Sequence, residues 1–503
     1  MHCDPKVIQG GMGAGVSNWR LARSVSQLGQ LGVVSGTALD VILARRLQDG
    51  DEGGYMRAGL DAFPFRAMAE RILKRYYIAG GKAVGAAYAN LRMHHKDGRR
   101  EIDELCIVGN FVEVWLAKQG HSHPVGINYL EKIQLPHLPS LYGAMLAGVD
   151  YVLMGAGIPL NIPGAMDRLA NHEAAEYPLY VNGGEAGEVT ISKFDPRAYM
   201  ECELPSLKRP KFLAIIASNT LATTMVKKAN GRVDGFVIEG PTAGGHNAPP
   251  RGKPPLSESG EPVYGVRDEV DLTKMCAMGL PFWLAGGFGT AEKLKEALAM
   301  GAAGIQVGTA FAFCRESGLR EDYKQRLLAD SRAGAAKVFT DPHSSPTGFP
   351  FKAAQLVGSN SELKVYEARK RVCDVGHLRE IYRTAEGKID YRCPAEPVAT
   401  YVAKGGRAED TVGKKCLCNS LLANIGMEQV RANEYREEGL VTAGDDLVNV
   451  ARFLPEGAES YGAADVIQAL LEGVELDETV AEITDLAAEP ELEGAAVVAE
   501  CLG

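Results

Sequence analysis

The sequence predicts a (β/α)8 barrel with insertions and a mostly helical C-terminal extension. The strongest observation is the stretch from Pro281 to Phe311, which contains a strand, a glycine turn, a helix, a second strand and a second glycine turn. The same pattern begins the chain, between Val7 and Gly36. Eight short apolar runs in all, each followed by a turn and most by a helix, are typical of this barrel.

The stretch from Pro281 to Phe311 contains one complete unit of the barrel. Phe282 to Ala285 is a short apolar run without helical periodicity, and the glycines after it form a tight turn, as at the end of a buried parallel strand. Thr290 is suited to cap a helix, and Gly301 is suited to the left-handed conformation at a helix end. Gly304 to Val307 is the next predicted strand.

Two glycine turns follow neighbouring strands of this unit, Gly286-Gly287 and Gly308-Thr309. Turns at the carboxyl ends of adjacent parallel strands bring several bare backbone N–H groups around one point, and such a point binds a phosphate. Either pair alone is explained well enough by tight turns. Their combination favours a phosphate site, because (β/α)8 barrels commonly bind phosphate on the loops after strands seven and eight.

The other six strands are predicted from short apolar runs that end in turn residues. In chain order they are Val7 to Gln9, Gly32 to Val34, Val125 to Asn128, Tyr151 to Met154, Phe212 to Ala217 and Gly235 to Glu239. A helix with an apolar side formed by Trp19, Leu21, Ala22 and Val25 follows the first strand. Ser218 begins a helix after the fifth strand in this order.

Residues 1–356 are predicted to form the barrel, with insertions at about 40–124 and 171–210. The first insertion contains helical pieces at 64–78 and 111–118 and a charged segment in which His94 and His95 are expected to be solvated. The second insertion resembles a hairpin. Residues 357–503 form the extension, which first contains cysteines and is then acidic.

The turn after Glu239 carries the most suggestive side chain, that of His246. This histidine follows Gly244 and Gly245 at the carboxyl end of a predicted barrel strand, where barrel enzymes hold their catalytic groups. A lone histidine is usually structural, but the two glycines allow close backbone approach and a proline-rich loop follows. The residues alone therefore predict a barrel enzyme that holds a phosphorylated cofactor or substrate, with His246 as acid or base.

Composition and charge limit the classes of protein and partner. The chain is 46% hydrophobic, yet its longest apolar stretch is interrupted by Asp150 and Pro159, so we expect no membrane span. The N-terminal residues do not resemble a signal peptide, and the ten cysteines form no small disulfide framework, so we expect a cytoplasmic protein with reduced thiols. The net charge of −10 comes from Glu456 to Glu500, which contains thirteen acidic residues and no Lys or Arg. No basic stripe suited to nucleic acid is present.

Five motifs together carry a resemblance to a known family. They are QGGMGAGVS (Gln9 to Ser17), VGIN (Val125 to Asn128), PTAGGHNAP (Pro241 to Pro249), AGGFG (Ala285 to Gly289) and GTAF (Gly308 to Phe311). In this order they resemble the nitronate monooxygenase family, formerly called 2-nitropropane dioxygenases, which is similar to the FMN-dependent enoyl-acyl carrier protein reductases. The resemblance extends from about Val7 to Leu356 and implies FMN bound in a (β/α)8 barrel.

The resemblance also implies roles for individual residues. By this resemblance, the FMN phosphate would be held by Gly286, Gly287, Gly308 and Thr309. The flavin ring would lie by Gly11, Met12 and Gly13 and would be contacted by Asn128. Gly244 and Gly245 would approach the cofactor, and His246 would be the catalytic base. Two positions depart from the family. Gly11 stands where the family often has Pro, and Glu239 stands where it often has Gln. A carboxylate near the flavin would disfavour an anionic reduced ring or an anionic substrate.

The implied reaction is the oxidation of nitronates or nitroalkanes with O2 to carbonyl compounds and nitrite. The alternative within the same resemblance is an enoyl-acyl carrier protein reductase that uses NAD(P)H. The chain has no clear dinucleotide fingerprint, because GGMGAG has the wrong spacing, and this favours the monooxygenase. Two further readings stay open, a flavin-binding sensor without catalysis and a cofactor-free barrel lyase or isomerase. The oligomeric state is open.

Four cysteines after Leu356 raise the question of a metal. Cys373, Cys393, Cys416 and Cys418 lie in an otherwise polar region and could ligate zinc or an iron–sulfur cluster. Their spacing is irregular and contains no CxxC. We therefore favour ordinary reduced thiols and assign no metal ligands from the sequence.

Overall fold

The computed structural model describes residues 4–184, 189–252 and 254–474. Its centre is a parallel barrel whose eight strands follow one another around the ring in chain order. The strands are β1 (Val7–Gln9), β2 (Gly32–Ser35), β3 (Val125–Leu130), β4 (Tyr151–Gly155), β8 (Lys211–Ile216), β9 (Gly235–Glu239), β11 (Phe282–Ala285) and β12 (Gly304–Val307).

Backbone hydrogen bonds between the first strand and the segment before β2 close the ring. The Gln9 N–H donates to the Leu31 carbonyl over 2.9 Å, and the Leu31 N–H donates to the Val7 carbonyl over 3.1 Å. On the other side, β1 pairs in parallel with β12. The predicted (β/α)8 barrel is confirmed, because every neighbouring pair of strands is parallel and no open edge is left.

The barrel is filled by every second residue of its strands. Ile8, Val33, Leu153, Leu213, Val237 and Trp283 form one buried apolar cluster. The alternate residues, such as Val7 and Val34, belong to the larger apolar cluster that also contains residues of the surrounding helices. Successive residues of a strand point alternately into the barrel and towards the helices, and both sets are buried. The strands therefore occur in the sequence as short, fully apolar runs.

Helices surround the barrel, and three of them, α1, α8 and α10, were predicted from the sequence. They include α1 (Trp19–Gln27), α6 (His137–Leu146), α7 (Ile162–Ala170), α8 (Asn219–Lys228), α9 (Leu272–Ala277), α10 (Ala291–Ala299), α11 (Thr309–Ala312) and α12 (Glu321–Arg332). Ser218 accepts from the Leu221 N–H at the start of α8, and Thr290 accepts from the Lys293 N–H at the start of α10. Both predicted N-caps are therefore confirmed.

The first insertion is helical. It contains α2 (Leu39–Gln48), η1 (Glu52–Gly54), α3 (Tyr55–Asp61), α4 (Arg66–Tyr76) and α5 (Arg100–Ala117). The sequence predicted only the last turns of α5. Nearly every residue of this helix from Ile102 onward is buried, so it lacks the polar face that makes a helical period visible. In the second insertion β5 (Ala175–Leu179) pairs antiparallel with β7 (Thr190–Phe194), as the hairpin prediction required.

The chain beyond β12 returns to the barrel rim. β13 (Val338–Asp341) and β14 (Phe351–Ala354) form a small sheet with β10 (Gly245–His246). The extension then contains α13 (Leu363–Ala368), α14 (Val398–Ala403), η4 (Ala408–Thr411), α15 (Leu417–Ala423), η5 (Ala432–Glu434), η6 (Asp445–Phe453) and α16 (Ala463–Leu471). It is mostly helical, as predicted, and adds a hairpin of β15 (Glu380–Arg383) and β16 (Ile389–Arg392), which β6 (Val181–Asn182) joins.

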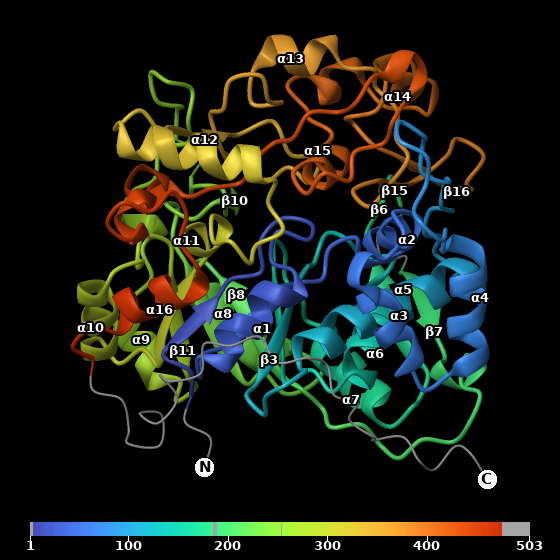
Figure 1. The fold of residues 1–503 in the computed structure, drawn as a ribbon, viewed down its shortest axis with the longest axis horizontal. Coiled ribbons are helices and arrows are strands. Elements are labelled where there is room, and N and C mark those ends of the chain that lie inside the picture. Colours follow the sequence, from blue (N-terminus) through green and yellow to red (C-terminus); the bar gives the residue numbers. More distant parts are fainter. Residues whose placement is uncertain (1–3, 185–188, 253, 475–503) are drawn as a thin grey trace.

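The extension packs against the barrel in two places. Helix α16 contacts α1, α10 and α11, at the lower left of Figure 1, whereas α13, α14 and α15 lie at the top. The end of the predicted acidic tail, residues 475–503, lies outside the described residues. Within the described ranges, no helix combines the length and apolar character needed to cross a membrane.

Candidate active site

A cavity of about 200 Å³ lies at the carboxyl ends of the barrel strands. Residues at or just after the end of every barrel strand line it, as expected for the functional rim of this fold. All of the predicted site residues face this one space, namely Gly11, Met12, Gly13, Asn128, Gly244, Gly245, His246, Gly286, Gly287, Gly308 and Thr309. The extension contributes Leu417, Cys418 and the segment from Thr442 to Gly444, which sequence reasoning missed.

The two glycine turns predicted to form a phosphate site are neighbours, because β11 and β12 pair with Ala285 opposite Gln306. Gly286 and Gly287 have φ values of 82° and 76°, a conformation that strains other residues. Gly308 is different, because a Cβ there would lie 3.6 Å from Met12, an ordinary contact. Packing therefore does not require glycine at position 308. The close approach of an anion to the backbone would require it, because a side chain there would hold the anion away.

The first turn of the chain packs directly on the third strand. A Cβ on Gly11 would lie 2.4 Å from the Cβ of Asn128, so the missing side chain allows these two segments to touch. Gly13 has a φ of 56°, which again favours glycine. The Gly11 that departs from the family pattern is thus explained by its contact with Asn128.

His246 belongs to β10 and pairs with Phe351 of β14. Its Nε2 lies 2.8 Å from the Ser345 hydroxyl oxygen, which in turn lies 2.7 Å from the hydroxyl oxygen of Thr347. The rings of Phe349 and Phe351 meet the imidazole edge to face. Burial in this apolar setting lowers the pKa of His246 to about 4, so the ring is neutral at neutral pH.

Glu239 ends β9 and faces the same cavity. Burial raises the pKa of its carboxyl group to about 7. Below that pH the group is mostly a neutral acid, which resembles the glutamine amide of the family in charge. The expected obstacle to an anionic ring or substrate is thus weak below about pH 7.

Gln306 of β12 is a cavity residue that the sequence reasoning missed. Its side-chain oxygen Oε1 is buried and has no hydrogen-bond partner within the described part of the chain. A buried acceptor is costly unless a ligand donates to it. The signal in the sequence was an amide within an otherwise apolar strand. Gln306 Oε1 and the open backbone at Gly308 together fit a ligand with an N–H-bearing ring and a phosphate, as FMN has.

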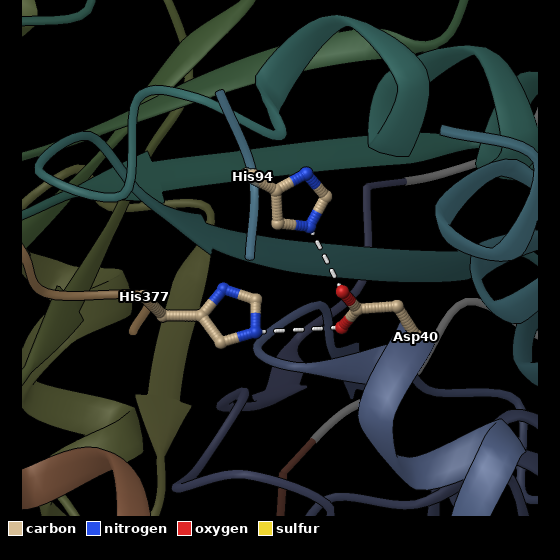
Figure 2. Close-up of side chains that lie close together, drawn as sticks. All are labelled: Asp40, His94 and His377. Atoms are coloured by element: carbon tan, nitrogen blue, oxygen red, sulfur yellow. Dashed lines mark hydrogen bonds and ion pairs between the residues drawn. The ribbon is translucent and has the colours of Figure 1, made fainter. Parts of the chain in front are cut away.

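The carboxylate of Asp40 meets the imidazole rings of His94 and His377, as Figure 2 shows. Asp40 of α2 lies 2.8 Å from His94 Nε2 and 3.4 Å from His377 Nε2, one contact on each carboxylate oxygen. His377 also lines the cavity. Burial favours the neutral acid, but His377 and His94 outweigh it and hold the pKa of Asp40 below its usual range. These three donors are of types that a divalent metal accepts.

The environment predicted for His94 was wrong. We expected a solvated side chain, but only 7% of it is exposed, because the charged loop folds over α2 and the imidazole pairs with Asp40. A polar run of sequence does not reveal a buried partner that lies 54 residues away.

Comparison with known proteins finds similarity to one family in part of the chain. The sequence model of the family described as "Nitronate monooxygenase" matches residues 185–347. A "Probable nitronate monooxygenase" of Bacillus subtilis (strain 168) is 31% identical over 133 residues, which cover 26% of this chain and 36% of the relative. The "Nitronate monooxygenase" of Pseudomonas aeruginosa PAO1 is 32% identical over 139 residues, covering 27% and 37%. The matched region thus spans little more than a third of either relative.

Solved structures align over most of the chain at low similarity. FabK from Thermotoga maritima aligns with 14% identity and a TM-score of 0.44, over 94% of this chain and 93% of that one. Nitroalkane oxidase from Streptomyces ansochromogenes aligns with 15% identity and a TM-score of 0.42, over 93% and 95%. Such values carry no argument about function. The family resemblance seen in the sequence is nevertheless confirmed by the match in residues 185–347, the region in which this chain is similar to nitronate monooxygenases.

Proposed function

We propose that this protein is an FMN-dependent oxidoreductase that oxidises nitronates or nitroalkanes with O2 to carbonyl compounds and nitrite. The observation that carries the proposal is one cavity at the barrel rim that gathers two glycine turns and a neutral histidine. The match of residues 185–347 to the nitronate monooxygenase family model supports the same function. Small-molecule substrate and O2 are the proposed partners.

In this proposal the backbone N–H groups at Gly286, Gly287, Gly308 and Thr309 hold the phosphate of FMN. Gln306 Oε1 accepts a hydrogen bond from the cofactor ring, which would satisfy an otherwise unpaired acceptor. The bound flavin supplies the redox chemistry, and the chain supplies binding, orientation and a largely apolar enclosure.

His246 is the proposed base. Its Nε2–H can donate to Ser345, whose hydroxyl can donate onward to Thr347, and this leaves the Nδ1 lone pair to accept a proton from the carbon of a nitroalkane. The low pKa keeps the ring neutral, and therefore able to accept a proton, through the neutral range. A preformed nitronate has already lost that proton and does not need the base.

The test compares His246→Ala with the unchanged protein, both loaded with FMN. We expect the variant to keep its flavin spectrum but to turn over a neutral nitroalkane at least about a hundredfold more slowly, the usual scale of general-base catalysis. The rate of turnover of the preformed nitronate, measured as O2 uptake without NAD(P)H, should fall much less. Equal losses on both substrates would remove the base role. A protein that binds no flavin, or that needs NAD(P)H and an enoyl thioester to turn over, would contradict the proposed function itself.

A further inference from the structure

Asp40, His94 and His377 form a cluster of three possible metal ligands, whose side chains point toward one another in Figure 2. Asp40 Oδ2 lies 2.8 Å from His94 Nε2, and Asp40 Oδ1 lies 3.4 Å from His377 Nε2. One donor atom of each side chain lies within 4.8 Å of the donor atoms of the other two. Among residues 4–184, 189–252 and 254–474, no other group of three His, Cys, Asp or Glu side chains meets this limit, and the four cysteines of the extension do not.

The cluster is buried, and it contains an anion whose partners are not permanently charged. The exposed fraction of the side chain is 4% for Asp40 and for His377 and 7% for His94. A buried carboxylate is costly unless it is paired with a positive charge or coordinates a metal. The ion-pair partners that the described residues give to Asp40 are the two histidines, which are charged only when protonated. A divalent cation would supply the positive charge that two neutral imidazoles do not.

The donor atoms and their spacing suit a zinc ion. Two imidazole nitrogens and one carboxylate oxygen are a ligand set that zinc accepts, whereas magnesium and calcium prefer oxygen ligands alone. Bonds of about 2.1 Å to a tetrahedral zinc ion place two ligand atoms about 3.4 Å apart. The separation of Asp40 from His377 already has this value, and the separation of Asp40 from His94 is 2.8 Å. A small outward shift of the His94 ring would therefore admit the ion.

The cluster leaves room for a further ligand of the ion. A cavity of about 20 Å³ is lined by Asp40 and His377, and it shares Tyr129, Leu130 and His377 with the main cavity. This volume is enough for about one water molecule. A zinc ion with three protein ligands and one water has an open position, as in zinc sites that act on a ligand, whereas structural zinc sites have four protein ligands.

Two arginines near the cluster have other partners. Arg45 lines a small cavity together with Asp40 and His94, but its guanidinium lies 3.9 Å from the carboxylate of Asp374. The guanidinium of Arg379 donates to the backbone carbonyl of His94 over 2.8 Å and not to the imidazole. The positive charges of these arginines therefore do not replace a cation between the carboxylate and the two rings.

We propose that Asp40, His94 and His377 bind a zinc ion at the wall of the main cavity. Without the ion, Asp40 accepts hydrogen bonds from the two imidazoles. When the ion binds, each neutral imidazole bonds to it through the Nε2 lone pair and carries its proton on Nδ1 instead. The Nδ1 of His377 has no partner within the described part of the chain, so its N–H is left to donate to a ligand in the cavity that this ring lines. The proposal rests on these three side chains and does not require the flavin.

The test measures zinc binding to full-length protein that has been dialysed against a chelator and is then titrated with Zn²⁺. We expect about one zinc ion per chain at this site and a higher urea midpoint once it binds, because the ion binds the folded state. His377→Gln and His94→Gln each remove a ligand but keep an N–H for Asp40. Each should weaken zinc binding at least about a hundredfold, the upper scale of losses when the support of a ligand is removed. His343→Gln, at an exposed histidine outside the cavity, should bind zinc as the unchanged protein does.

Cobalt in place of zinc identifies the ligand atoms. Bound Co²⁺ should show visible bands without the intense charge-transfer band of a cobalt–thiolate bond, because the ligands are nitrogen and oxygen. A thiolate band, no bound ion, or equal zinc affinity in His377→Gln, His94→Gln and His343→Gln would overturn the site. If one ligand variant does not fold, the other still decides. Flavin content is recorded in the same samples, so the absence of flavin would count against the proposed function and not against the zinc site.

Discussion

At the scale of single residues, the cavity holds two partly buried titratable side chains, and the pKa of each is shifted in the direction that favours its neutral form. Burial raises the pKa of Glu239 to about 7 and lowers that of His246 to about 4. Between these values the carboxyl group is protonated and the imidazole is not. The cavity can therefore receive an anionic nitronate without a fixed negative charge at position 239.

Glu239→Gln tests this reading. As pH rises through about 7, the unchanged protein gains a negative charge in the cavity, so its kcat/KM for a nitronate should fall. The variant cannot ionise there and should keep its rate. A pH profile of O2 uptake for both proteins makes the comparison, and an alkaline decline of the same size in both would rule out Glu239 as its source.

The same substitution should also change the pH dependence of stability. The folded-state pKa of Glu239 is raised, so the folded protein keeps a proton that the unfolded chain loses above the ordinary glutamate pKa. The raised pKa of Glu239 therefore stabilises the folded protein fully below that ordinary pKa. This stabilisation, up to about 3 kcal/mol, is lost as pH rises from there to about 7. Urea unfolding should therefore show that the stability of Glu239→Gln, relative to that of the unchanged protein, increases as pH rises from acid to neutral.

At the scale of elements, Asp40 fastens three segments that are distant in sequence. It lies on α2, His94 lies in the loop before α5, and His377 lies before β15. The carboxylate also accepts from the Val41 N–H over 2.8 Å. One buried anion thus joins two segments of the first insertion to the extension.

Asp40→Asn should loosen this junction. In the variant, the amide would present an N–H group to one imidazole N–H, where the carboxylate presents an acceptor. The free energy of unfolding should therefore fall by about 1 to 3 kcal/mol, the usual cost of a buried polar group without its partner. Because the Asp40 pKa is depressed in the folded state, its contribution is present above the ordinary aspartate pKa and fades only in acid. Urea midpoints at neutral pH measure the loss. Asp61→Asn, whose side chain is 71% exposed, is the matched control, and equal midpoints for the two variants would contradict this role.

At the scale of the whole molecule, the sequence predicted what is local and missed what is distant. All eight barrel strands, the caps at Ser218 and Thr290 and the hairpin in the second insertion were readable, because each is set by neighbours within a few residues. His246 and the glycine turns could be placed at one rim because parallel strands bring their carboxyl ends together.

The remaining features depend on contacts between segments far apart in the chain. Thr442 to Gly444 line the cavity, and the Gly444 N–H donates to Thr309 from 135 residues away. No local pattern marks such a contact. His94 was misplaced for the same reason.

The central claim is that bare backbone N–H groups at the barrel rim hold the phosphate of FMN, and Gly308→Ala tests it most directly. The new Cβ would meet its nearest atom at 3.6 Å, so the fold and the urea midpoint should not change. Titration with FMN and with riboflavin, which lacks the phosphate, should show FMN binding weakened by at least about tenfold, the scale of one charge-assisted hydrogen bond, and riboflavin binding far less affected. Gly265→Ala, at an exposed glycine with no atom within 4 Å of the added Cβ, should bind both as the unchanged protein does. FMN affinity that is equal in the two variants would contradict the account.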